Sequence, residues 1–199
     1  METEGTLILI SFVLSITPGP NNLMLLASGI NHGFMRTLPH MAGILTGMAL
    51  MFAVIWQGLS FVVAQFPWGP RVVATVGGIY LLYLAWKIIT SAGPAAGREG
   101  PGKPLHMVEA MVFQWLNPKA WVMTTTLVGL HAAEHQGWVG LAGLVLVFSA
   151  VCLPCISVWV LFGAQLGRIL RQPVALRAAN ITMGVLLVAT MVPVLLGQI

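Results

Sequence analysis

The stretch SITPGPNNLM, Ser15 to Met24, interrupts an apolar run near the start of the chain. It places two prolines, a glycine and two asparagines where a plain helix would otherwise be expected. The apolar residues before it, Thr6 to Ile16, make only about 16 Å of helix at about 1.5 Å per residue. That is roughly half of the hydrocarbon thickness of a bilayer. A helix that crosses a membrane here must therefore break at depth.

The composition is that of an integral membrane protein. Of the 199 residues, 58% are hydrophobic and 7% are charged, against about a quarter charged in soluble domains. The mean hydropathy is +0.92. No polar stretch is long enough to fold separately, so we expect one transmembrane domain over residues 1–199. The basic residues are scattered over short connections, which argues against nucleic-acid binding and leaves a small solute and the lipid bilayer as expected partners.

Six apolar segments have the roughly 20 residues that a transmembrane helix needs. They run from Gly5 to Ile30, Leu38 to Ala64, Val72 to Thr90, Met107 to Leu130, Trp138 to Gly163 and Ala175 to Leu196. The first of them follows Glu2 and Glu4 without a basic residue, which is unlike a signal peptide, so we expect it to stay attached.

Lysine and arginine fall mainly on one side of these segments. That side carries Arg36, Lys87, Arg98, Lys103, Arg168, Arg171 and Arg177, and the other carries Arg71 alone. The positive-inside rule predicts that the first side is cytoplasmic, with both termini periplasmic in a bacterial inner membrane.

The two halves of the chain resemble each other in their arrangement. A shift of 100 residues superimposes the first three segments on the last three, with Pro18 on Pro118 and Gly43 on Gly143. Because each half has an odd number of crossings, the second must enter the membrane from the opposite side. The predicted fold is all-α, with six transmembrane helices in two inverted three-helix repeats, about 5–90 and 107–196.

A break is predicted at an equivalent point in each half. Thr17-Pro18 and Asn117-Pro118 each combine an N-cap residue with proline, which is favoured at the first helical position. We expect each dipeptide to begin a new half-helix, so that the first and fourth transmembrane helices are broken near mid-membrane. Irregular backbone at this depth is tolerated only around a buried or water-lined cavity, so two breaks suggest one shared site.

Lys119 gives the predicted site its charge. A lysine at the bilayer centre costs about 2.5 to 3.5 kcal/mol on insertion scales, so one without a function is not expected there. Helix N-termini also attract anions. Neutral polar groups are expected nearby from Asn21, Asn22, Gln114, Asn117 and Thr124. This set suits a small zwitterion. The alternative is two proline kinks packed against their neighbours, with Lys119 snorkelling or paired with a backbone carbonyl.

Three motifs carry a resemblance to a known family. TPGPNN (17–22), GGIYLLYLAWKI (77–88) and LNPKA (116–120) resemble, in this order and spacing, the LysE/RhtB family of amino-acid exporters. TPGPNN followed by HGF is similar to its cysteine and O-acetylserine exporter branch. The resemblance implies amino-acid efflux driven by the proton gradient, with homoserine or threonine as other possible substrates. It places site residues at Thr17, Pro18, Gly19, Pro20, Asn21, Asn22, Asn117, Pro118 and Lys119, and with the neighbouring polar residue Gln114 these are the predicted substrate-binding residues.

Two positions depart from the family pattern. Many members have aspartate where this chain has Asn21, and many have asparagine where it has Gln114. The chain contains no aspartate, so an aspartate that couples protons at position 21 is excluded and a neutral substrate is favoured over a cationic one. Glu109 is the remaining candidate for proton coupling if it is buried; otherwise it is an interfacial carboxylate. His32, His40 and His106 are expected near the cytoplasmic interface.

Other patterns leave alternatives open. HAAEH (131–135) matches a metalloprotease pattern in an unsuitable context, a short loop, so a solvated loop is favoured. Cys152 and Cys155 have the spacing of a redox dithiol, and a membrane thiol–disulfide carrier is an alternative function. Metal efflux is another, disfavoured by the lack of Asp or His clusters, and a channel is the competing mechanism. Gly43 and Gly47 predict close helix packing, within the chain or in a homodimer. We expect no cofactor, no metal site and no enzymatic activity.

Overall fold

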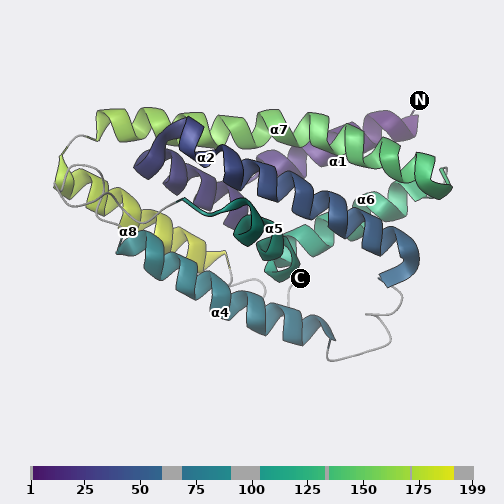
Figure 1. Ribbon diagram of the computed structural model, residues 1–199, viewed down its shortest axis with the longest axis horizontal. Helices are drawn as coiled ribbons and strands as arrows, with labels where there is room; N and C mark the ends of the chain where they lie inside the picture. Colours follow the sequence, from purple (N-terminus) through teal and green to yellow (C-terminus); the bar gives the residue numbers. More distant parts are fainter. Residues whose placement is uncertain (1, 60–68, 91–103, 133–134, 171, 191–199) are drawn as a thin grey trace.

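The computed structural model describes residues 2–59, 69–90, 104–132, 135–170 and 172–190. These residues form helices, with no strand among them: α1 (Glu2–Ile16), α2 (Pro20–Val54), η1 (Ile55–Leu59), α4 (Gly69–Ile89), α5 (Met107–Leu116), α6 (Pro118–Ala132), α7 (Gly137–Ile169) and α8 (Pro173–Ala189). Two stretches, Pro20–Gly58 and Gly137–Ile169, are long and apolar enough to cross a membrane. Shorter apolar helices make up much of the rest (Figure 1).

The first predicted connection is not a loop. Residues 31–37 were expected to link the first two segments, but α2 is helical on both sides of Gly33. Gly33 has φ 76° and ψ 177°, a conformation essentially restricted to glycine. The hydroxyls of Ser28 and Thr37 lie 2.8 Å apart, whereas nine residues of continuous helix would separate them by about 13 Å. One residue therefore folds α2 back into two arms, 20–32 and 34–54.

The cationic side chains gather toward one end of the bundle. The Gly33 kink, the C-terminal ends of α4 and α7 and the N-terminal end of α8 lie at the left of Figure 1. These ends carry Arg36, Lys87, Arg168 and Arg177. The N-terminal ends of α1 and α7 and the C-terminal end of α6 lie at the right of the figure. This distribution agrees with the predicted asymmetry, while the orientation in a membrane stays a prediction.

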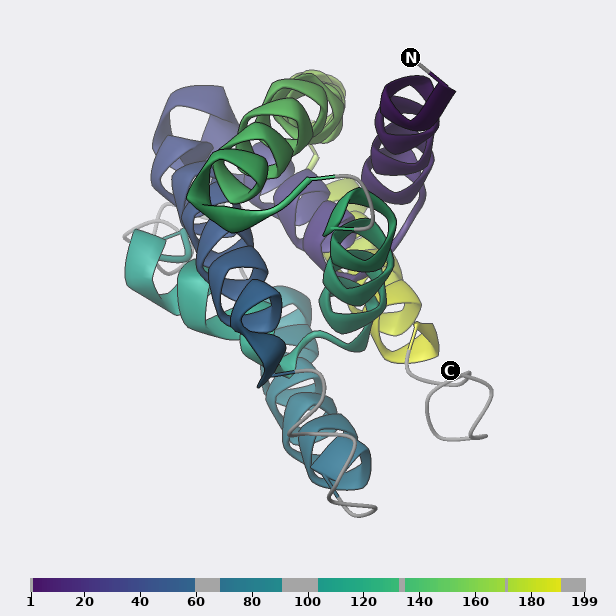
Figure 2. The same cartoon turned by 90° about the vertical axis from the view of Figure 1, so that its right-hand side faces the viewer.

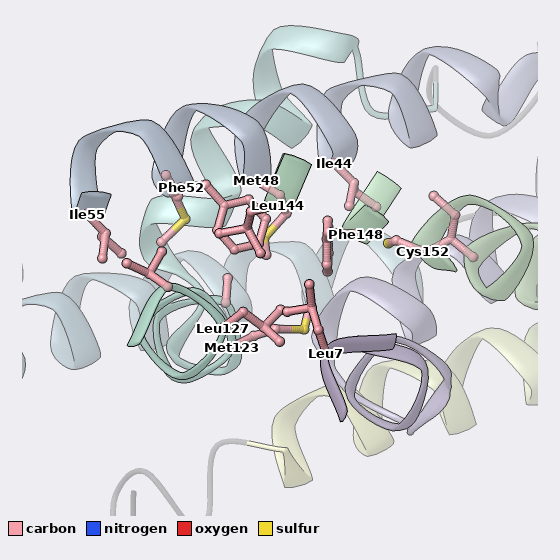
Figure 3. Close-up of a cluster of buried hydrophobic side chains, with 14 of the residues drawn as sticks. Leu7, Ile44, Met48, Phe52, Ile55, Met123, Leu127, Leu144, Phe148 and Cys152 are labelled. Atoms are coloured by element: carbon pink, nitrogen blue, oxygen red, sulfur yellow. The ribbon is translucent and has the colours of Figure 1, made fainter. Parts of the chain in front are cut away.

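The core lies between α1, the second arm of α2, α6 and α7. Figure 3 shows its side chains pointing toward one another, with the Phe52 and Phe148 rings edge to face at 5.0 Å. Met48, Leu127 and Leu144 fill the space around them. Figure 2, which looks along the bundle, shows α6 near its middle, where it contacts α1, α2, α5 and α7. Burial of these residues fixes α6, and with it Lys119, against the other helices.

Glycines allow the backbones of α2 to approach two other helices. A Cβ at Gly43 would meet the Met107 carbonyl, and one at Gly47 would lie 2.6 Å from the Gln114 side chain. This confirms internal packing for the predicted glycine pair. In the first arm, a Cβ at Gly29 would meet the Val160 carbonyl of α7. Two glycines of α7 make the reverse contacts: Gly163 faces the Leu26 carbonyl and Gly167 the Ile30 carbonyl.

Candidate functional site

The first break lies at the expected place, but its second helix starts two residues later. α1 ends at Ile16 and α2 begins at Pro20, with Gly19 in extended conformation as the N-cap. The prediction that Thr17 caps the helix and Pro18 begins it was therefore wrong. Because Pro20 disfavours helical geometry at the residue before it, a helix starting at Pro18 could not continue through Gly19. Pro20 takes the first helical position instead.

The second break follows the prediction. α5 ends at Leu116, Asn117 has φ −95° and ψ 109°, and α6 begins at Pro118. The Asn117 side-chain oxygen accepts a hydrogen bond from the Lys119 backbone N–H at 3.1 Å. This bond caps one of the backbone donors that a helix start leaves without a partner. Asn117 is also 2% exposed, so the cap is buried in the protein.

Lys119 joins the two breaks. Its ammonium donates to the Thr17 carbonyl at 2.9 Å, the Thr17 hydroxyl at 2.8 Å and the Pro18 carbonyl at 3.4 Å. These groups lie at the C-terminal end of α1, where a helix has partial negative charge. Pairing of Lys119 with backbone carbonyls belonged to the alternative of two packed proline kinks, and this pairing is present in the structure. The helices are nevertheless interrupted, rather than merely kinked, at both points.

The remaining carbonyls at the end of α1 also have partners. The Asn22 amide donates to the Ser15 carbonyl at 2.7 Å and to the Thr17 carbonyl at 2.8 Å. The Trp159 indole of α7 donates to the Ile16 carbonyl at 3.1 Å. Carbonyls that a broken helix leaves open must be satisfied in a low-dielectric environment. Three side chains from different parts of the chain do this here.

Gly19 leaves room for the close approach of the Lys119 side chain. A Cβ at position 19 would lie 2.9 Å from the Lys119 Cδ and 3.2 Å from its Nζ. Both are shorter than the usual contact of about 3.5 to 4.0 Å between carbon atoms. The backbone at Gly19 is extended, with φ −176° and ψ 177°, so glycine is not needed there for its conformational freedom.

Asn21 and Gln114 form an amide pair between the two halves. The Asn21 amide donates to the Gln114 side-chain oxygen at 2.8 Å, and Gln114 donates back at 3.4 Å. Gln114 also donates to the Ala110 carbonyl at 2.8 Å and is 0% exposed. The two positions that depart from the family pattern thus contact each other, and the pair is neutral.

A small cavity lies beside these groups, and it encloses about 30 Å³. Its polar lining consists of Ser15, Gly19, Asn21, Asn22, Asn117 and Lys119, and its apolar lining includes Ile44, Met48, Met123, Phe148, Cys152 and Ile156. The volume is room for about two water molecules. The site is therefore closed to an amino acid in this conformation.

The structure brings five of the ten predicted site residues to the cavity lining: Gly19, Asn21, Asn22, Asn117 and Lys119. The other five predicted residues do not line the cavity but hold or position those that do. Thr17 and Pro18 bind the ammonium, Gln114 holds Asn21, and Pro20 and Pro118 begin the two helices. The hydroxyl of Thr124 does not contribute, because it is bonded to carbonyls of its own helix at Ala120 and Trp121.

Sequence reasoning missed Ser15 and Cys152 as lining residues. Ser15 begins the stretch that marks the break, so its place at the site could have been expected. Cys152 lies at least 128 positions from that stretch in the chain, and its spacing to Cys155 gave no signal for the cavity. Both cysteines are buried and free.

The structure places two titratable residues that the sequence left open or put at an interface. Glu109 is exposed in the first turn of α5 and accepts a hydrogen bond from the His106 backbone N–H at 2.8 Å, as part of a capping box. It lacks the burial on which its proposed proton coupling depends, and that function stays a prediction. His40 was expected at an interface, but it is 1% exposed and lies inside the bundle.

The HAAEH segment is only partly described, since Glu134 lies outside the described residues. The His131 and His135 rings stack at 4.3 Å, and His131 contacts the Gly140 carbonyl at 3.1 Å through Nε2. These contacts join the end of α6 to the start of α7. They give the two histidines a packing function at this end of the bundle.

Comparison with known proteins agrees with these motifs. The family described as LysE type translocator matches residues 12–197. Cysteine/O-acetylserine efflux proteins of Escherichia coli strain K12, Escherichia coli O9:H4 strain HS and Shigella flexneri serotype 5b are each 30% identical over 186 residues, which is 89% of this chain and 90% of theirs. No solved structure matches the chain significantly. The chain therefore belongs to the LysE type translocator family, and it is a membrane translocator.

Proposed function

We propose that the protein exports a small neutral amino acid, of the cysteine and O-acetylserine kind or the homoserine and threonine kind, across a bacterial inner membrane. The observation that carries the proposal is the contact between the Lys119 ammonium and the Thr17 and Pro18 carbonyls. It joins the two breaks into one polar site next to a closed cavity. The relatives named for cysteine/O-acetylserine efflux support the substrate class.

The charges of this contact suit a zwitterion. A substrate carboxylate would bind Lys119 and the N-terminal ends of α2 and α6, and the substrate ammonium would bind the carbonyls that Lys119 releases. An anion would leave those carbonyls without a donor, at a cost of about 1–3 kcal/mol each. A cation would satisfy the carbonyls but leave Lys119 without an acceptor in a low-dielectric site. A zwitterion replaces both partners at once.

The apolar wall of the cavity suits a small side chain. Met48, Met123, Phe148 and Ile156 face the polar groups across the cavity, together with the Cys152 thiol. Thioether and aromatic groups make favourable contacts with sulfur and with short aliphatic chains. No acidic or basic side chain is among these wall residues. A neutral substrate side chain therefore fits this wall better than a charged one.

Alternating access requires the closed cavity to open to each side in turn. The inverted repeat is supported by an exchange of contacts: α1 of the first half packs on α7 of the second, and α5 of the second packs on α2 of the first. Rocking of the two halves about the shared site is the movement we propose, as in other inverted-repeat transporters. The proton gradient is the proposed driving force.

The test loads cells with each amino acid as a dipeptide and measures its efflux. The wild type is expected to speed the exit of small neutral amino acids. Lys119→Met and Asn117→Ala are expected to lower this efflux at least about tenfold, because each removes a charge-assisted or capping bond. Arg177→Met, at an exposed cation outside the cavity, is the matched control. Near-normal efflux in both site variants would favour two packed kinks without a substrate site.

Proteoliposomes separate this proposal from its alternatives. With an imposed proton gradient, the exporter should accumulate substrate against its concentration gradient, whereas a channel would only equalise it. The Cys155→Ser variant is expected to keep its flux within about threefold, because Cys155 is not among the residues that line the central cavity, and a dithiol carrier needs both thiols. Loss of all activity in that variant would favour the thiol–disulfide carrier.

A further inference from the structure

A second cavity lies further along the first arm of α2. It encloses about 100 Å³ between that arm, α4 and the residues before α5. Its polar lining consists of Ser28, Asn31, His32, His40 and Lys87. Asn22 lines the central cavity and Asn31 lines this one, and nine residues of helix separate them by about 13 Å. We call this second cavity the side chamber.

His40 is the unexplained group in the side chamber. It is 1% exposed, and neither of its ring nitrogens has a hydrogen-bond partner in the described part of the chain. A neutral imidazole offers one donor and one acceptor. Most buried polar atoms in proteins are satisfied, and one that is not needs an explanation. Both nitrogens are covered in this conformation, and a turn of the ring toward the chamber would bring them to a polar solute there.

The other polar side chains of the chamber differ from His40. The Ser28 hydroxyl contacts Thr37, and the Asn31 amide donates to the Ala27 carbonyl and to Asn180. Lys87 lines the rim of the chamber, with its ammonium 5.5 Å from the centre of the Tyr83 ring, and no carboxylate is among the lining residues. The chamber thus combines a cation with a buried donor and acceptor. That combination matches a solute with a carboxylate and a second polar group.

The sizes of the two cavities point the same way. About 100 Å³ holds roughly seven to ten water molecules, whereas about 30 Å³ holds about two. A small amino acid can replace the water of the side chamber but not that of the central cavity. Lys87 lies in the last turn of α4, and this end of α4 lies with the fold-back of α2 at the cation-bearing end of the bundle, which is the predicted cytoplasmic end.

We propose that the side chamber is a second binding site, which takes a small amino acid from the cytoplasm before it reaches the central cavity. The substrate carboxylate faces Lys87, and its amino group or side-chain polar atom bonds to His40. The inference rests on the proposed function, since it assigns a second site to the same substrate class. The function proposed for Lys119 and the central cavity stays the same with or without this second site.

Kinetics from the cytoplasmic side test the contact with His40. In inside-out vesicles, His40→Leu is expected to raise KM about tenfold with kcat within about twofold of the wild type. Tenfold corresponds to about 1.4 kcal/mol, the size of one hydrogen bond. His40→Gln should restore KM to within about threefold, because glutamine again offers a donor and an acceptor. His106→Gln, at an exposed histidine near the same end, is the control.

Labelling tests occupancy without relying on His40. Ile88→Cys adds a thiol to the chamber lining, and a membrane-impermeant maleimide applied from the cytoplasmic side should label it. The wild type, whose two cysteines are buried, gives the background. Millimolar substrate is expected to slow labelling at least about threefold, and Val174→Cys, at an exposed position of α8, should show no such protection.

The outcomes separate this inference from the proposed function. Normal KM in His40→Leu, a fall in kcat alone, or labelling of Ile88→Cys without protection would each overturn the second site, while wild-type export stands. A KM effect rescued by glutamine, together with protection, supports it. A wild type that exports no amino acid overturns the proposed function, and the second site with it.

Discussion

Replacing Gly19 by alanine tests the contact that joins the two breaks. The new Cβ would lie 2.9 Å from the Lys119 Cδ and 3.2 Å from its Nζ. Carbon atoms pack at about 3.5 to 4.0 Å, so the lysine side chain must move by roughly 0.6 to 1 Å. The bonds from its ammonium to Thr17, now 2.8 and 2.9 Å, would then be lengthened and weakened. The backbone at position 19 is extended and accepts alanine without strain.

The expected loss follows from the bonds broken. A hydrogen bond to a charged group contributes about 1.5 to 3 kcal/mol, and part of the loss is recovered as the lysine finds other partners. We expect the kcat/KM of transport to fall about 10- to 100-fold. The assay is uptake by inside-out vesicles at matched protein levels. Gly129→Ala, on α6 with no atom within 4 Å of the added Cβ, is the matched control and should transport normally.

A double-mutant cycle decides whether the loss acts through Lys119. In a Lys119→Met background the ammonium is already absent, so Gly19→Ala should add less than about threefold to the loss. Neighbouring residues that share an interaction are non-additive in this way, whereas independent sites add. An equal effect of Gly19→Ala with and without the lysine, or transport within twofold of wild type in the single variant, would refute the reasoning.

Two further predictions concern other parts of the fold. Gly33→Ala meets no atom within 4 Å, so its cost is that of a positive φ alone, about 1–3 kcal/mol; a detergent-solubilised Tm should fall, and a Tm equal to that of Gly129→Ala would show that the kink does not need glycine. Gln114→Leu leaves the Asn21 amide without its 2.8 Å partner and should destabilise by about 1–3 kcal/mol. Asn21→Leu in the same chain should recover part of that loss, and a further equal loss in the double variant would contradict the amide pair.

The sequence predicted best what depends on neighbouring residues. Asn117 and Pro118 satisfy local capping rules with one proline, and their break is where those rules put it. At the first break two prolines compete, and the geometry that Pro20 imposes on Gly19 moved the helix start past Pro18. The same capping rules allow a helix start at Pro18 or at Pro20, and the prediction of Pro18 was wrong.

What depends on distant parts of the chain could not be predicted. The partners of Lys119 lie 102 positions away in sequence, so only the pairing of the two halves brings them together. His40 is buried inside the bundle, beside a cavity that it shares with residues of α4 and residues before α5. A loop was expected at residues 31–37, but the chain turns at Gly33 alone, and the turn is held by the contact between Ser28 and Thr37. None of these follows from periodicity or composition.

The glycine contacts between α2 and α7 determine which parts of the protein can move separately. At Gly29, Gly163 and Gly167 the facing backbone occupies the place of a side chain, so sliding one helix past the other would drive carbonyls into each other. The contact between the first arm of α2 and the C-terminal half of α7 must then act as the pivot when the two halves rock against each other. Bending is left to the interrupted backbone at residues 17–19 and 117, which makes those positions hinges as well as ligands.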